Sequence, residues 1–145
     1  MEYLVQILTG FLGSLGFAFI FNIKKVNVFP SAFGGIVSWG IFLISYYFTQ
    51  NNVISYFISS VLTTIYAEII AMIIKSPTTI ILICSFIPLV PGGSLYYTMR
   101  YAFREDWEQF MLYGLDTLKL AVALAFGIII VSTVIKTSKN ILLKK

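Results

Sequence analysis

The chain alternates between long apolar segments and short polar ones. The apolar segments hold 19 to 25 residues each and cover residues 3–21, 30–48, 53–74, 77–99 and 111–135. As an α-helix, about 20 residues cross the roughly 30 Å of hydrocarbon in a bilayer. The pattern therefore predicts an all-α integral membrane protein. We expect a bundle of about five transmembrane helices that forms a single domain, residues 1–145, within the lipid bilayer.

The fourth segment is interrupted by the stretch FIPLVPGGSLYY. Pro88 and Pro91 each remove a backbone N–H donor, and Gly92 and Gly93 permit a positive φ. An unpaired peptide group in hydrocarbon costs several kcal/mol, so such backbone is tolerated at depth only where protein or trapped water surrounds it. We therefore expect the fourth helix to be broken by this Pro/Gly motif near mid-membrane.

Half-helix ends of this kind hold small polar or anionic substrates in many secondary transporters. The N–H groups of about residues 93–95 would point into the gap, and Ser94 is placed to cap the second half-helix. Two other interpretations stay open. The motif is also compatible with a simple proline kink, and with a re-entrant loop that leaves four true spans.

The distribution of basic residues favours five spans over four. With five spans and an outside N-terminus, only Arg100 and Arg104 lie outside, and seven basic residues lie inside. These seven are Lys24, Lys25, Lys75, Lys136, Lys139, Lys144 and Lys145. With four spans the division is five inside against four outside. Because Lys and Arg accumulate on the cytoplasmic side, we expect an outside N-terminus and a cytoplasmic C-terminus with a basic tail, residues 136–145.

Several polar and ionisable residues lie within the apolar segments. Ser60, Thr64 and Glu68 are spaced by four, so a helix places them on one face. A carboxylate at depth is a functional candidate, either as carrier of a coupling proton or as partner of a substrate amine. Alternatively, Glu68 snorkels to the interface or pairs with a buried base. Asp116 and Lys119 can form an ion pair at i, i+3, unless both lie in the headgroup layer.

Small residues and one proline predict how the first two helices pack. Gly10 and Ser14 form a small-xxx-small pair, and the second segment repeats this spacing with serine and glycine. Such pairs let helix backbones approach closely, so we expect both helices to pack against protein. Pro30 is expected near the start of the second helix, where its missing N–H costs least.

Composition limits the possible chemistry. The chain is 59% hydrophobic and 11% charged, has no histidine and has one cysteine, Cys84. It therefore has almost no ligands for zinc or haem and lacks a nucleophile with its base. We expect no metal, no other cofactor and no enzymatic activity. The net charge of +4 comes mostly from the basic tail, which fits a membrane surface better than nucleic acid.

Three stretches together resemble the threonine/serine exporter family, specifically its small membrane-only component. They are GFAFIFN at residues 16–22, AE at 67–68 and IPLVPGGSLY at 87–96. The similarity covers essentially the whole chain, and PLVPGGSLY is its most specific part. The resemblance implies a bacterial inner-membrane exporter of threonine and serine, driven by the proton gradient.

The resemblance also implies a partner and a motif. The partner would be a larger subunit with its own membrane half and a soluble N-terminal region, which this chain lacks. The family's proline-glycine motif falls on Pro88, Pro91, Gly92 and Gly93. Some split pairs look instead like exporters of a dicarboxylate such as succinate, so the substrate is either an amino acid or a dicarboxylate. A membrane scaffold or assembly protein without transport is the remaining alternative.

Overall fold

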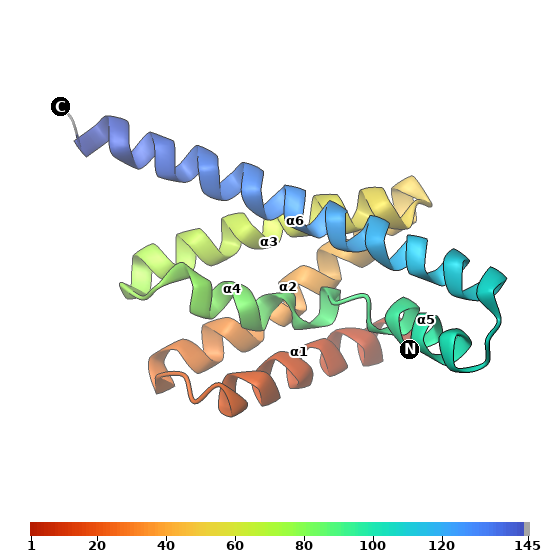
Figure 1. Cartoon of the computed structure of the whole chain (residues 1–145). Helices are drawn as coiled ribbons and strands as arrows, with labels where there is room; N and C mark the ends of the chain where they lie inside the picture. The colour runs from red at the N-terminus through yellow and green to blue at the C-terminus, as the bar shows by residue number, and fades with distance from the viewer. Residues whose placement is uncertain (144–145) are drawn as a thin grey trace.

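The computed structural model describes residues 1–143, with side chains as far as residue 138, and its helices are shown in Figure 1. In chain order they are α1 (Glu2–Ile20), α2 (Lys25–Thr49), α3 (Asn52–Ile74), α4 (Thr78–Phe86), the 3₁₀ turn η1 (Ile87–Leu89), α5 (Gly92–Phe103) and α6 (Trp107–Leu143). The described residues contain no strand. The predicted all-α fold is confirmed.

These helices make four membrane crossings, or five if the bent pair formed by α4 and α5 is one span. α1, α2, α3 and α6 are each long and apolar enough to cross a membrane. The segment from α4 through η1 and the helix α5 pass the same test only together, and they are bent by 61° at the break between them. The fourth apolar segment is therefore broken at the predicted Pro/Gly motif, and the protein is a multi-pass membrane protein with four continuous membrane helices and one bent pair, either a broken span or a re-entrant loop.

The ends of the helices fall into two sets (Figure 1). The α1–α2 turn, the α3–α4 turn and the C-terminal part of α6 lie at one end of the bundle. The N-terminus, the α2–α3 turn and the α5–α6 turn lie at the other. This arrangement is that of an odd number of crossings. Of the predicted basic tail, Lys144 and Lys145 lie outside the described residues, as does the side chain of Lys139.

α2 begins earlier than the sequence pattern predicts. Its first residue is Lys25, so Pro30 lies inside the helix, and the expectation that Pro30 opens it is wrong. The extra turn is anchored by Asn27, which is buried and accepts a hydrogen bond from Ser76 Oγ at 2.8 Å. The carbonyl of Pro30 accepts a hydrogen bond from the Tyr66 hydroxyl at 2.7 Å. These tertiary contacts stabilise a helix start that the apolar pattern alone does not reveal.

Glycines and side chains that carry a hydroxyl group fill the centre of the bundle, whereas large apolar side chains face outward. A Cβ added to Gly35 of α2 would lie 2.7 Å from the Gly10 carbonyl oxygen and against Ser14 Oγ, so α1 and α2 are in backbone contact here. The predicted small-residue packing is therefore confirmed. Fully buried hydroxyl residues include Ser14, Ser31, Ser38, Ser55, Ser59, Ser60, Thr63, Thr64 and Ser85.

The lipid environment explains why this core consists of small and hydroxyl-bearing residues. Lipid tails are as apolar as leucine, so burying leucine between helices gains little, and close backbone packing stabilises the bundle instead. Hydroxyl groups also bond across helices; for example, Ser59 Oγ of α3 donates to the Ser38 carbonyl of α2 at 2.6 Å. Outward positions such as Leu8, Leu12 and Phe29 stay exposed, as lipid contact requires.

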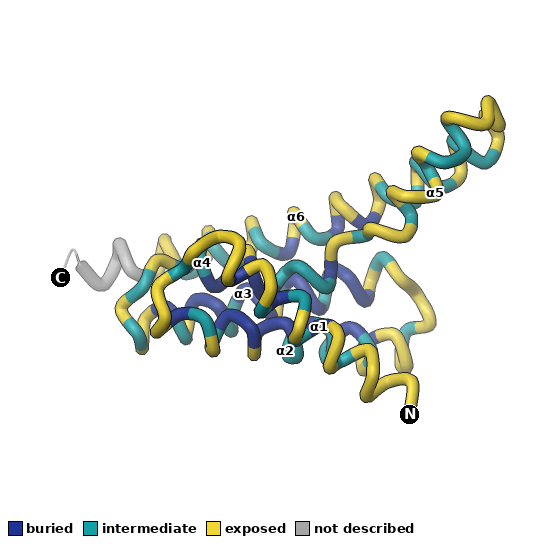
Figure 2. The backbone as a smooth tube through the Cα atoms, turned by 90° about the horizontal axis from the view of Figure 1, so that it is seen from below, coloured by how far each residue is buried: buried dark blue, intermediate teal, exposed yellow. Residues whose placement is uncertain are grey.

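α5 and the adjoining start of α6 stand apart from the rest of the bundle, whereas the remainder of α6 packs on α3. α5 packs against α6, and none of its residues is buried. Figure 2 shows the hairpin projecting from the bundle, with exposed and intermediate residues along it, whereas buried residues concentrate in the interior formed with α2 and α3. The second half of the broken span is therefore attached chiefly through α6 and through the short link at the break.

The α1–α2 contact makes a first prediction. Gly35→Ala should force the two helices apart, because the new Cβ would meet the Gly10 backbone. We expect a loss of about 1–3 kcal/mol, seen as a lower melting temperature of the detergent-purified protein. Gly40→Ala is the matched control on the same helix, because an added Cβ there meets nothing within 4 Å. Equal melting temperatures for wild type and Gly35→Ala would contradict the observed packing.

Candidate functional site

The break in the fourth span is short and partly hydrogen-bonded. Val90 is extended, with φ −61° and ψ 124°, and connects η1 to α5. Its N–H donates to the Ile87 carbonyl at 3.3 Å, and the Gly92 N–H donates to the Val90 carbonyl at 2.7 Å. The Leu95 N–H donates to the Pro91 carbonyl at 3.1 Å, which closes the first turn of α5. The chain therefore changes direction over about two residues.

One detail of the predicted break is wrong, namely the residue that caps the second half-helix. Gly92 and Gly93 both have negative φ, because α5 already begins at Gly92. The N-cap of α5 is Pro91, so Ser94 lies inside the first turn and is not the cap. Its hydroxyl instead donates to Asp116 Oδ2 of α6 at 3.1 Å. The carboxylate offers this hydroxyl a stronger acceptor than a neutral group does.

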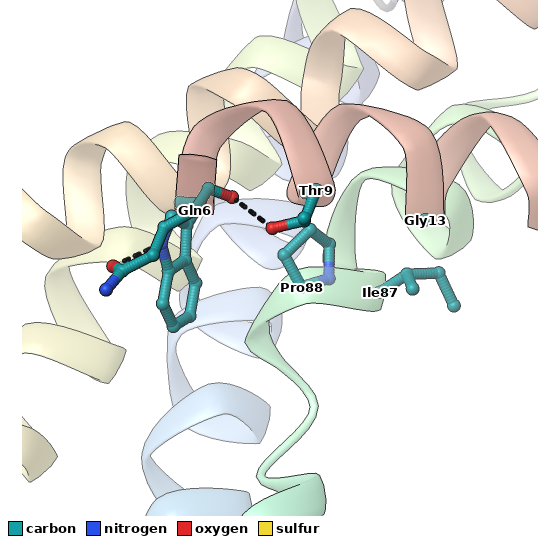
Figure 3. A pocket seen from close by; sticks show the side chains of 7 residues that line it. Gln6, Thr9, Gly13, Ile87 and Pro88 are labelled. Atoms are coloured by element: carbon teal, nitrogen blue, oxygen red, sulfur yellow. Dashed lines mark hydrogen bonds between the residues drawn. The ribbon is translucent and has the colours of Figure 1, made fainter. Parts of the chain in front are cut away.

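α1 covers one side of the break, as Figure 3 shows. A Cβ at Gly10 would lie 3.5 Å from Pro88 Cγ, and one at Gly13 would lie 3.8 Å from Ile87 Cγ2. Both distances are ordinary van der Waals contact. Gly10 is the ninth of the nineteen residues of α1, so the break lies level with the middle of that helix. The predicted position near mid-membrane is consistent with this contact.

A cavity of about 260 Å³ lies at this contact, and polar groups form part of its wall. Gln6, Thr9 and Trp39 line it together with Gly10, Gly13, Ile87 and Pro88. The Trp39 indole N–H donates to Gln6 Oε1 at 3.2 Å, and the Thr9 hydroxyl donates to the Gln6 carbonyl at 2.9 Å (Figure 3). Of the four motif residues, only Pro88 lines this cavity.

The other motif residues face the α5–α6 seam or the surface. Gly92 and Gly93 are exposed, with nothing within 4 Å of an added Cβ. Beyond the Ser94–Asp116 bond, the Thr98 and Thr117 hydroxyl oxygens lie 3.4 Å apart. The contact between α5 and α6 also contains stacked tyrosines. The ring of Tyr113 lies 5.2 Å from that of Tyr97 and 5.5 Å from that of Tyr101, between ring centroids.

The side chains of Asp116 and Lys119 lie in different surroundings. Asp116 accepts the bond from Ser94, whereas Lys119 is exposed and lines an apolar groove beside Val53 and Phe57. Within the described residues the two side chains form no ion pair. Helix geometry brings residues at i, i+3 within reach, but the hydroxyl on α5 gives the carboxylate a partner on another face.

Glu68 lines a separate cavity of about 340 Å³ at the end of the bundle that holds the α3–α4 turn. Three helices form the wall. Glu68 comes from α3; Thr78, Thr79 and Leu82 come from α4; Ser132, Ile135 and Lys136 come from α6. Glu68 is only 9% exposed. The cavity thus combines one carboxylate, one ammonium group and three hydroxyl groups.

The other two residues that share a face with Glu68, Ser60 and Thr64, are fully buried and form hydrogen bonds within α3. Ser60 Oγ donates to the Phe57 carbonyl at 2.8 Å, and Thr64 Oγ1 donates to the Ser60 carbonyl at 2.7 Å. Ser60 also lies against Gly127 of α6, where an added Cβ would collide with its hydroxyl. The structure therefore places Ser60 in the α3–α6 contact, and neither Ser60 nor Thr64 lines the Glu68 cavity.

Sequence reasoning missed several residues that line the two cavities. Gln6, Thr9 and Trp39 carry no motif, and only the tertiary approach of α1 to the break brings them together. Lys136, which the sequence predicts as part of the basic tail, lines the other cavity together with Ser132. The two residues are spaced by four and so lie on one face of a helix. That spacing was a usable signal.

A multi-pass helical bundle with one span broken beside a partly polar cavity has the architecture of a membrane transporter. The chain belongs to the threonine/serine exporter family, because the family model described as Threonine/Serine exporter, ThrE, matches residues 6–134. No curated protein and no solved structure matches the chain. The match contains the whole break and Glu68, and the resemblance stated from the sequence motifs is confirmed.

The open surroundings of the two glycines make a second prediction. Gly93→Ala should leave the melting temperature of the purified protein unchanged or slightly higher, because its φ is negative, the space is open and alanine favours helix. Gly34→Ala is the comparison, because its Cβ would collide with Ser85 and should lower the melting temperature. A large destabilisation by Gly93→Ala would show that this description of the break is wrong.

Proposed function

We propose that this chain is the small membrane subunit of a bacterial inner-membrane exporter of threonine and serine. Family membership supports the exporter class. The observation that carries the proposal is the break at residues 87–91, which lies level with the middle of α1 and beside a cavity with Gln6 and Trp39 in its wall. Irregular backbone at this depth is expected where a polar substrate passes.

The break also supplies a means of movement. α5 is held mainly by α6 and by the link at Val90 and Pro91, and a few such residues suffice to absorb a rotation of one segment against another. The moving element is then α5 with the first turns of α6. The fixed element is α1 to α4 together with the rest of α6, which packs on α3. Glycine and hydroxyl contacts rigidify the fixed part, since Gly35 is in contact with Gly10.

An outside N-terminus and a cytoplasmic C-terminus form part of the proposal. Lys24, Lys25 and Lys75 lie at the turns of one end of the bundle, and Arg100 and Arg104 lie toward the other. The cytoplasmic side is the one enriched in basic residues. The Glu68 cavity then opens at the cytoplasmic end, where an exported substrate enters.

The composition of the Glu68 cavity favours an amino acid over a dicarboxylate. A zwitterion presents an ammonium group for Glu68 and a carboxylate for Lys136, and the side-chain hydroxyl of threonine or serine matches Thr78 and Thr79. A dicarboxylate such as succinate would place its second negative charge near the carboxylate of Glu68. Like charges at short range in a low dielectric are unfavourable. Glu68 is also the group proposed to carry the coupling proton.

A larger subunit of the same family completes the transporter in this proposal. An odd number of spans places two homologous halves in opposite orientations, so that their discontinuous helices face each other at mid-membrane. The small cavity beside Pro88 is half of a site in this arrangement. The protein acts as a transporter subunit without enzymatic activity, in contrast to a scaffold that only assembles other proteins.

Pro91→Ala tests transport against scaffolding. The substitution restores an N–H at the break, which favours a continuous helix. Efflux of labelled threonine from cells that express both subunits should fall to background, while co-purification of the partner stays normal. Pro77→Ala is the matched control, because Pro77 precedes α4 outside the break. Normal efflux by Pro91→Ala would contradict the transport role of the break.

Glu68→Gln tests the coupling role. The amide keeps the size of the side chain but cannot release a proton, so efflux should be lost or become independent of the pH gradient while the protein still inserts. Labelled succinate measured in the same cells identifies the substrate class. Wild-type efflux of threonine across the pH range by Glu68→Gln would remove this carboxylate from the mechanism, and succinate efflux in place of threonine would overturn the amino-acid assignment.

A further inference from the structure

A second surface of the bundle carries an apolar groove that the transport proposal does not use. It has a volume of about 480 Å³ and lies between the first turns of α3 and the middle of α6. Seven of its eight lining residues are apolar, and the eighth is Lys119. The full lining is Val53, Ile54, Phe57, Lys119, Val122, Ala123, Phe126 and Ile130. On α6 these residues form one continuous stripe at helical spacing.

The groove has the depth of one leaflet. Val53 and Ile54 belong to the first turn of α3, so the Lys119 end of the groove lies near the end of the bundle. From Lys119 to Ile130 there are eleven residues, which in an α-helix rise about 16 Å. The hydrocarbon of one leaflet is about half of 30 Å. The groove therefore runs from near the headgroup layer to near the bilayer centre.

The position of Lys119 suits a negatively charged headgroup. The lysine is exposed, and its aliphatic stem can follow the groove while the ammonium group reaches the interface. Asp116, one turn earlier, bonds to Ser94 of α5 instead. The groove thus has a basic side chain at headgroup level and an apolar remainder as long as one leaflet is thick. This combination matches an anionic amphiphile.

The lining argues against a partner helix in this groove. Helices that dock in membranes use small residues to approach closely, as Gly10 and Gly35 do between α1 and α2. The wall here contains Phe57, Phe126 and Ile130, whose bulk keeps another backbone at a distance. A flexible acyl chain can fill the space between such side chains.

We propose that the α3–α6 groove is a binding site for an anionic phospholipid. The lipid phosphate pairs with the Lys119 ammonium group, and one acyl chain lies along the groove against Phe57 and Phe126. Because α3 and α6 also carry Glu68 and Lys136, a lipid at this seam would stabilise the pair of helices that forms the wall of the Glu68 cavity.

The test measures retained lipid on the purified chain by native mass spectrometry. Protein is reconstituted with equal amounts of phosphatidylglycerol and phosphatidylcholine and then transferred to detergent. We expect wild type to retain phosphatidylglycerol preferentially, and Lys119→Gln to reduce that retention about fivefold. Lys25→Gln removes one exposed charge that lines no part of the groove and should retain lipid like wild type.

A second variant tests the shape of the groove separately from the charge of Lys119. Val122→Trp narrows the groove at a half-exposed position and leaves Lys119 in place, so it too should lose phosphatidylglycerol. Both substitutions lie on the outer surface, and the variants should purify with wild-type helix content. Equal retention of the two lipids by wild type, or wild-type retention by Lys119→Gln, would overturn the proposal. A photo-crosslink from position 126 to the larger subunit rather than to lipid in the assembled complex would also overturn it.

Discussion

The need to shield peptide groups from hydrocarbon governs this structure. A break in a span exposes backbone that lipid cannot hydrogen-bond. The chain limits the exposure by keeping the break short, with Gly92 bonded back to Val90, and by covering it with α1. Even a small side chain at Gly10 or Gly13 would lie in ordinary van der Waals contact with Pro88 and Ile87, so α1 lies directly against the break. The same helix meets α2 at Gly35, where only glycine fits against the Gly10 carbonyl oxygen, so α1 serves both the packing of the bundle and the cover of its break.

The sequence predicted the architecture well because the bilayer imposes simple rules. Span length and the effect of Pro88 and Pro91 depend on local composition, and they correctly predicted a helical membrane bundle whose fourth apolar segment is broken. The errors arose where tertiary contacts decide. Pro30 lies inside α2 because Asn27 bonds to Ser76 from the α3–α4 turn. Ser94 lies inside α5 because its helix starts two residues earlier, and Asp116 then provides its partner.

The candidate site was harder to predict, because spacing along one helix does not say which neighbour a face will meet. Ser60, Thr64 and Glu68 share a face, yet Ser60 meets Gly127 while Glu68, two turns on, lines a cavity together with Lys136. The break and Glu68 line two different cavities of the described structure. A substrate that visits both would have to pass between them, which fits a transport route better than a single binding pocket.

The helices of this bundle differ greatly in length. α6 has 37 residues and α1 has 19, which correspond to about 55 Å and about 28 Å of rise. A hydrocarbon layer of about 30 Å matches α1 when that helix stands upright, whereas α6 exceeds it unless it leans strongly or emerges at both faces. The apolar part of α6, residues 111–135, alone rises about 37 Å, so an upright α6 would produce a hydrophobic mismatch that α1 does not. Membrane thickness then changes the tilt of α6, and through α6 it changes the position of α5.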